Sequence, residues 1–185
     1  MPRIPILSPE QMNSEQRRIH DAVVSGPRGM LVGPLRAAIH RPELADKWQQ
    51  FGELLRYRTS LPSRLSELAI LVTARHWDCQ VEWHLHERDA IKAGLEAPIM
   101  AAVQLGERPA EMDADTAAAH DFGAELLRDR FVSEPTYQLV LARWGVVGVI
   151  ELTAIIGYYS MVAMTLNAHE LPLPDGVAPP LEARA

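Results

Sequence analysis

Residues 63–94 decide the fold class, and they read SRLSELAILVTARHWDCQVEWHLHERDAIKAG. The first part of this stretch is largely apolar and follows Pro62-Ser63, which is a typical helix start. Asp78 is the expected N-cap of a second helix, which ends at Gly94. The sequence therefore predicts two consecutive helices, with a turn of the chain near Asp78.

Helix signals continue on both sides of this stretch, whereas strand signals are scarce. Proline or an N-cap residue opens each further segment. The predicted helices run from Ser8-Pro9-Glu10 to about Ser25, from Pro42 to about Arg58, from Pro98 to about Gly106, from Asp113 to about Arg130, and from Pro135, with a further apolar helix over Gly145–Leu166. In the Pro42 helix, the residues expected on one face are Leu44, Trp48, Phe51, Leu54 and Leu55. The predicted fold class is all-α.

The length and composition are those of one globular domain. The chain has 185 residues, of which 48% are hydrophobic and 23% are charged. We expect a single domain over residues 1–185, with an extended, proline-rich tail over residues 171–185. The net charge of −6 comes without a basic cluster, so we expect no nucleic-acid partner. The single cysteine and the absence of a signal-peptide core at the N-terminus predict a cytoplasmic location.

The apolar segment Gly145–Leu166 is long enough to span a bilayer. Glu151 lies inside it and no basic cluster flanks it, so we expect a buried or interface helix and no membrane. Such a helix is too apolar to be left exposed on a small monomer. We therefore expect a closed homo-oligomer.

Two short motifs occur twice in the same order. FGELLR at residues 51–56 is echoed by FGAELLR at residues 122–128, and ELAIL at residues 67–71 aligns with ELTAI at residues 151–155. Glu-Leu-Leu-Arg is a common sequence in helices, so the repeat has two possible origins, chance and duplication of a helical hairpin. The second copy lacks the polar residues that follow the first, so a duplication would place the chemistry in the first half.

Cys79, Glu82 and His86 share one face of the predicted second helix because they are three, four and seven residues apart. The helix N-terminus favours a thiolate at Cys79. His86 suits a general acid or base, and Glu82 is placed to orient it or to carry a second proton. Glu67 lies in an apolar run where an unpaired carboxylate is costly, and a hairpin near Asp78 would bring it to the same face.

Each of these residues also has an ordinary structural explanation. A lone cysteine is commonly a small buried hydrophobe, a Glu–His pair is commonly a solvated surface pair, and a buried glutamate commonly bonds a helix end. Only the combination of four favours a catalytic set. His84 and His86 point in different directions and no zinc-helix motif occurs, so we expect no metal and no cofactor. Trp83 and Tyr158 are candidates for lining a substrate pocket, with core or interface packing as the alternative.

The chain resembles the carboxymuconolactone decarboxylase family, which includes the AhpD-like alkylhydroperoxidases, over about residues 31–167. The residues that carry the likeness are Glu67-Leu68-Ala69-Ile70-Leu71, Cys79-Gln80-Val81-Glu82-Trp83, His86, Gly94-Leu95 and Gly157-Tyr158-Tyr159. The resemblance implies an AhpD-like helical fold built from a duplicated helical unit. It also implies assembly as a homotrimer or homohexamer.

The resemblance separates two branches of the family by one residue. The AhpD-like branch has a glutamate, a Cys-x-x-Cys pair and a histidine; Glu67, Cys79 and His86 match, but Glu82 replaces the second cysteine. The chain therefore cannot close that disulfide. The decarboxylase branch carries a glutamate four residues before its histidine, as Glu82 and His86 do. This likeness implies acid–base, lyase-type chemistry on a small organic acid or lactone, with Arg75 as the expected cation for the substrate carboxylate.

Two alternatives to the lyase stay open. One is a one-cysteine thiol peroxidase of peroxiredoxin type, in which Cys79 reduces a peroxide and an external thiol restores it. The other is a non-catalytic helical oligomer. The expected catalytic residues are Glu67, Cys79, Glu82 and His86, and the expected substrate-binding residues are Arg75, Trp83 and Tyr158.

Overall fold

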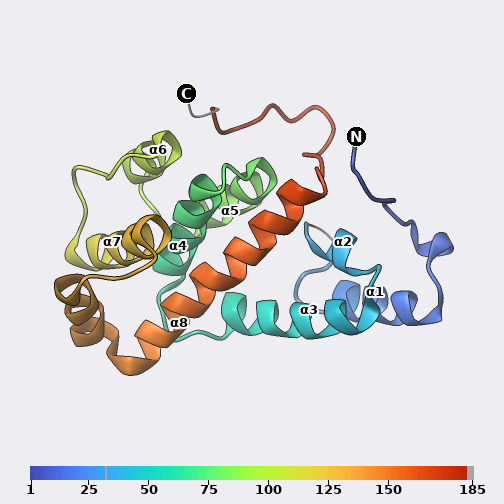
Figure 1. Ribbon diagram of the computed structural model, residues 1–185, viewed down its shortest axis with the longest axis horizontal. Helices are drawn as coiled ribbons and strands as arrows, with labels where there is room; N and C mark the ends of the chain where they lie inside the picture. Colours follow the sequence, from blue (N-terminus) through green and yellow to red (C-terminus); the bar gives the residue numbers. More distant parts are fainter. Residues whose placement is uncertain (32, 183–185) are drawn as a thin grey trace.

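The computed structural model describes residues 1–31 and 33–182, and every regular element in these two ranges is a helix (Figure 1). In chain order the elements are the 3-10 helix η1 (Pro9–Gln11) and the α-helices α1 (Ser14–Ser25), α2 (Leu35–Ala38), α3 (Pro42–Tyr57), α4 (Ser63–His76), α5 (Gln80–Lys92), α6 (Ala97–Leu105), α7 (Ala114–Asp129) and α8 (Glu134–Ala168). The predicted all-α class is confirmed.

Helix α8 crosses the molecule diagonally and separates two groups of helices (Figure 1). Helices α4 to α7 lie on one side of it and α1 to α3 on the other, and α8 packs against α3, α4, α5 and α7. The apolar core has two clusters. The first joins α1, α2, α3 and α8 to one side of α4 and α7 and includes Cys79. The second fills the space between α4, α5, α6 and α7 and includes Trp83.

The chain turns between α4 and α5, as the sequence predicts, but Asp78 is not the N-cap of α5. Helix α4 ends at His76, Asp78 takes a left-handed φ of 48°, and Cys79 is the N-cap. The amide of Cys79 donates to the carbonyl of Ala74 at 2.8 Å, which closes the end of α4. Asp tolerates a positive φ better than most residues, so Asp78 ends one helix rather than beginning the next.

The N-terminal segment differs from the single helix expected from Ser8-Pro9-Glu10. It forms the short η1, and α1 begins later because Asn13 caps it. The Asn13 side chain accepts from the amide of Gln16 at 2.9 Å, and the Gln16 side chain accepts from the amide of Asn13 at 3.0 Å.

The buried face of α3 is narrower than expected. Trp48 and Leu55 are buried, whereas Leu44, Phe51 and Leu54 are 44–50% exposed. The residues that face the core are Ala45, Trp48, Gly52 and Leu55. The neighbours α1, α2 and α8 cover only this one side of α3 in the described residues, so the apolar stripe is partly left at the surface.

The two helices expected from Pro135 onward are both present, and they meet at a non-helical break at Gly145 within the element α8. This residue has φ 63° and ψ −173°, which a glycine adopts without the steric cost of a side chain. By length and composition α8 could cross a membrane, and 33% of its most apolar stretch is buried. Glu151 is satisfied within the fold, because its carboxylate accepts from the amide and hydroxyl of Ser60 at 2.6–3.1 Å.

The described part of the tail, residues 171–182, is not helical and returns across the molecule to α5 and α6 (Figure 1). Leu181 is buried in the second core cluster. The Gln80 side chain holds the Leu181 backbone at both its amide (2.8 Å) and its carbonyl (2.9 Å), and Gln104 donates to the carbonyl of Pro180 at 2.7 Å. The tail is therefore docked by backbone hydrogen bonds and one apolar anchor.

Candidate active site

Glu67, Glu82 and His86 form one buried cluster at the junction of α4 and α5. Nδ1 of His86 lies 2.7 Å from Oε2 of Glu67, with which it shares a hydrogen bond, and Nε2 of His86 lies 3.0 Å from Oε1 of Glu82. Glu82 and His86 meet because they are one helical turn apart on α5. Glu67 reaches them because the turn near Asp78 folds α4 against α5. The expected contact between His86 and a carboxylate is confirmed.

Burial and charge act on His86 in opposite directions. The residue is 2% exposed, and burial alone would lower its pKa. The carboxylates of Glu67 and Glu82 outweigh this effect and raise the pKa of His86 to about 9. At neutral pH the ring is therefore an imidazolium, and both of its N–H groups point to carboxylates.

Cys79 does not have the thiolate character expected at a helix N-terminus. It is fully buried in the first core cluster. Burial raises the pKa of the Cys79 thiol to about 12, although the backbone amides of Glu82 and Val81 act in the opposite direction. The desolvation cost of the anion exceeds what the helix end supplies, so the thiol is protonated at neutral pH.

Tyr159 contacts the histidine, and Tyr158, which was expected to line a substrate pocket, lies beside Tyr159. The rings of Tyr159 and His86 meet edge to face with centroids 4.9 Å apart. Tyr158 lies one step further away, with its ring 5.1 Å from that of Tyr159. Both tyrosines are buried in α8, so sequence pattern alone had no means of ranking them. Trp83 is fully buried in the second core cluster, where its indole is part of the packing between helices.

The side chain of Arg75 contacts Asp78 and the C-terminal tail. Its guanidinium contacts Asp78 at 3.1 Å and donates to the carbonyl of Glu182 in the tail at 2.9 Å. These contacts join the end of α4 to the docked tail. The arginine that stands closer to the cluster is Arg56 of α3, whose charge acts on Glu67 and Tyr159 and which pairs with Asp89.

One set of side chains has the composition of a metal site. A ligand atom from each of Glu67, His86 and Asp89 lies within 4.8 Å of the others. In this structure the three groups are already engaged, because Nδ1 of His86 is bonded to Glu67 and Asp89 is paired with Arg56. The expectation of no metal stays a prediction.

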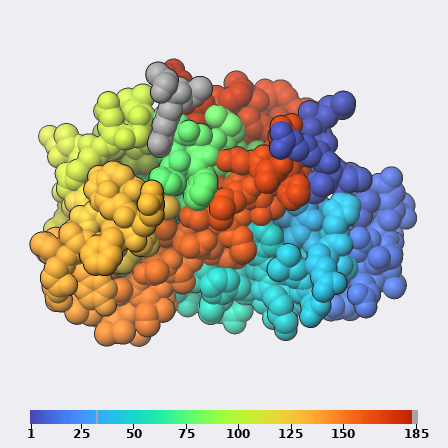
Figure 2. Space-filling view, in the orientation of Figure 1, coloured from blue at the N-terminus to red at the C-terminus, as the bar shows by residue number. Residues whose placement is uncertain are grey.

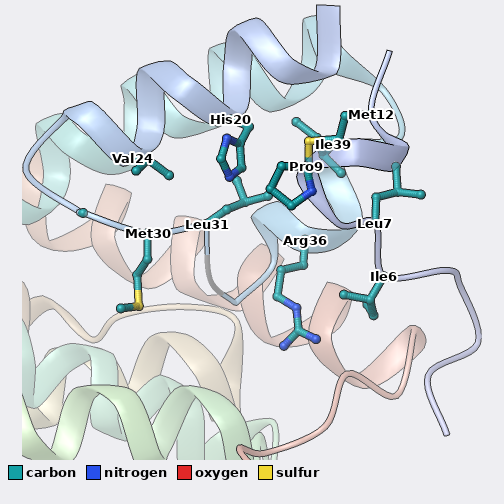
Figure 3. A pocket seen from close by; sticks show the side chains of 11 residues that line it. Ile6, Leu7, Pro9, Met12, His20, Val24, Met30, Leu31, Arg36 and Ile39 are labelled. Carbon is teal, nitrogen blue, oxygen red and sulfur yellow. The ribbon is translucent and has the colours of Figure 1, made fainter. Parts of the chain in front are cut away.

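Three cavities lined by described residues lie apart from the cluster. One of about 300 Å³ lies between the N-terminal segment, α1 and α2, and Figure 3 shows His20 and Arg36 among its mostly apolar walls. A second, of about 590 Å³, lies between α4, α6 and α7 and includes Arg75 in its wall. The third lies beside Phe131 where α7 is joined to α8. The pocket expected around the four candidate residues stays a prediction.

Comparison with known proteins finds a family model that matches the segment containing this site. Residues 42–125 match the model of the carboxymuconolactone decarboxylase family, and this segment contains Glu67, Cys79, Glu82 and His86. This match covers less than half of the chain, and the AhpD-like helical fold is shared with solved structures. No curated protein matches the sequence.

Solved structures share the fold at low sequence identity. An uncharacterized peroxidase-related protein from Silicibacter sp. TM1040 aligns with a TM-score of 0.77 and 15% identity, covering 95% of this chain and 92% of that one. An alkylhydroperoxidase AhpD core, also an uncharacterized peroxidase-related protein, from Ralstonia eutropha JMP134 aligns with a TM-score of 0.69 and 14% identity, covering 94% and 93%. A protein of unknown function from Agrobacterium tumefaciens gives 0.65 and 13%, covering 77% and 99%. These likenesses establish the fold.

Proposed function

We propose that this protein catalyses acid–base chemistry of the lyase type on a small organic acid or lactone. The observation that carries the proposal is the position of His86 between two buried carboxylates, those of Glu67 and Glu82. Withdrawing three ionisable groups from water is costly, and well-packed apolar residues often stabilise a protein at least as well. Buried and mutually coupled ionisable groups are instead typical of sites where protons are transferred.

The proposed reaction transfers a proton at a carbon beside a carbonyl group. In a decarboxylation the carbon–carbon bond to the departing carboxylate breaks, CO₂ leaves, and the electron pair of that bond forms an enolate. The enolate carbon then takes one proton, so the reaction consumes one proton from water overall. We assign the proton delivery to Glu82, which takes the proton from Nε2 of His86, while Glu67 holds Nδ1 and keeps the ring oriented. His86 recovers its proton from solvent.

A second candidate is the one-cysteine peroxidase, which is favoured by the peroxidase-related descriptions of two structural neighbours. In that reaction Cys79 would be oxidised to a sulfenic acid as the peroxide is reduced to an alcohol, and an external thiol would restore it. A buried thiol with a pKa of about 12 is a poor nucleophile at neutral pH. This property of Cys79 supports the acid–base proposal over the peroxidase.

A substrate panel tests the two candidates against each other. The wild-type protein is incubated with carboxylated butyrolactones, small oxo acids, hydrogen peroxide and an alkyl hydroperoxide, with dithiothreitol as the external thiol. We expect CO₂ release or uptake of solvent deuterium with a lactone or oxo acid, and no loss of peroxide beyond a thiol-only control. Peroxide consumption alone would favour the peroxidase. No turnover of any kind would contradict both and leave the non-catalytic oligomer.

A further inference from the structure

Arg28 lies in the loop between α1 and α2 and reaches two distant helices. A Cβ atom on Gly52 of α3 would lie 2.5 Å from Nη2 of Arg28 and 2.0 Å from the hydroxyl oxygen of Tyr158 in α8. Both groups therefore sit directly over the glycine, and the missing side chain of Gly52 makes room for them. The guanidinium and the phenol hydroxyl are held side by side by three separate parts of the chain.

The Arg28 guanidinium has polar atoms that the fold leaves unsatisfied. Its Nε and Nη2 are buried and have no hydrogen-bond partner among the described residues. Two other partly buried arginines face carboxylates, Arg56 with Asp89 and Arg64 with Asp113. Buried donors on a cation are expensive to leave unpaired, so they call for an anionic partner.

The unsatisfied donors are connected to the candidate active site. The Tyr158 hydroxyl is influenced by Arg28, which lowers its pKa, and by Glu82, which raises it, although burial has the largest effect and raises the pKa to about 12. The hydroxyl also donates a long hydrogen bond of 3.5 Å to the carbonyl of Trp48, and the neighbouring guanidinium of Arg28 is within its hydrogen-bonding range. A continuous series of rings then leads from Tyr158 through Tyr159 to His86.

We propose that Arg28 binds a carboxylate of the substrate, with the Tyr158 hydroxyl as a second donor, and so directs the reacting carbon to Glu82 and His86. This inference rests on the proposed acid–base function and adds to it the cation that holds the substrate carboxylate. A guanidinium matches a carboxylate in charge and in its forked donor geometry. The role that the sequence suggested for Arg75 passes to Arg28, because Arg75 is engaged by Asp78 and the tail.

The test is binding of butyrolactone γ-carboxylate and of its neutral methyl ester, measured by NMR titration of the full chain. The variants are Arg28→Gln, Arg28→Lys and the control Arg36→Gln, whose guanidinium lines the separate cavity of Figure 3. We expect Arg28→Gln to weaken binding of the acid tenfold or more and to leave binding of the ester unchanged. Arg28→Lys should recover part of the loss, and Arg36→Gln should bind like the wild type.

Thermal unfolding of the same variants separates a binding role from a structural one. A guanidinium with unsatisfied donors stabilises the fold little, so Arg28→Gln should keep the wild-type Tm or raise it. The proposal is overturned if the wild type binds neither probe, if acid and ester weaken equally, or if Arg28→Gln loses binding together with Tm. Arg28-dependent binding without any turnover would instead contradict the proposed function and leave the carboxylate site in place.

Discussion

Nδ1 of His86 and Oε2 of Glu67 lie 2.7 Å apart, although the two residues are 19 positions apart in the sequence. The contact exists because the chain reverses after α4. Glu82 contacts one ring nitrogen of His86 from the same helix, and Glu67 contacts the other from α4. A pair on one helix would leave one ring nitrogen for another partner. The Glu67 carboxylate therefore fixes the orientation of the His86 ring and favours its positive charge.

The raised pKa of His86 predicts a specific pH dependence of stability. Its folded-state pKa is about 9, above the usual 6.5, so its contribution is fully present below pH 6.5 and is lost as the pH rises through 9. We expect the free energy of unfolding of the wild type, relative to His86→Asn, to fall by about 3 kcal/mol across this window, from 1.36 kcal/mol per pKa unit. Denaturant titrations between pH 6 and 10 measure it, and a pH-independent difference would mean that the ring is neutral in the folded protein.

Cys79 should be unreactive while the protein is folded. The thiol is fully buried and its pKa is raised to about 12, so thiolate is scarce at neutral pH. We expect no reaction with a chromogenic disulfide reagent on the minute timescale at pH 8, and complete reaction in guanidinium chloride. Mass spectrometry after peroxide treatment should find no sulfenic acid. Rapid oxidation of Cys79 in the folded protein would support the peroxidase and contradict the proposed catalysis by Glu82 and His86.

Gly52 should tolerate no side chain. A Cβ there would lie 2.0 Å from the Tyr158 oxygen, so Gly52→Ala must displace Tyr158 and Arg28. Overpacking of this kind costs about 1–3 kcal/mol. Gly157→Ala on α8 is the matched control, because nothing lies within 4 Å of the position its Cβ would take. Alanine should stabilise the helix there by about 1 kcal/mol. Equal effects of the two substitutions on chemical denaturation would show that Gly52 is not a point of close approach.

The exposed face of α8 predicts self-association. Val146, Val147 and Ile150 are 60–62% exposed and adjacent on the helix, and α8 reaches the surface on the face shown in Figure 2. We expect light scattering to find a closed oligomer, a trimer or hexamer, at micromolar concentration. Ile150→Glu should shift it to monomer, while Leu105→Glu, which changes a similarly exposed residue on α6, should not. A wild-type monomer would contradict this expectation.

The sequence was sufficient for what depends on local chemistry. The helix starts at Pro42 and Ser63, the cap at Asp113 and the break between α4 and α5 all follow from the residues at those positions. The one-turn spacing of Glu82 and His86 follows in the same way.

What the sequence could not predict depends on tertiary neighbours. The predicted buried face of α3 was only partly correct, because periodicity does not say how much of a helix its neighbours cover. The predicted thiolate at Cys79 was wrong, because burial raises the pKa of the thiol more than the helix end lowers it. Arg28 was missed because a loop residue has no periodic pattern, and its place over Gly52 arises only when α3 and α8 pack together.

The most direct test of the central claim is the deuterium content of product formed in D₂O from a lactone or oxo acid that the wild type turns over, compared across Cys79→Ser, Glu82→Gln and His86→Asn. If Glu82 and His86 deliver the proton, Glu82→Gln and His86→Asn each lose roughly 10²- to 10⁴-fold in the rate of deuterium incorporation, as expected for removal of a general acid. Cys79→Ser then keeps most of the rate. Loss of the rate in Cys79→Ser, with Glu82→Gln and His86→Asn close to the wild type, would contradict the account.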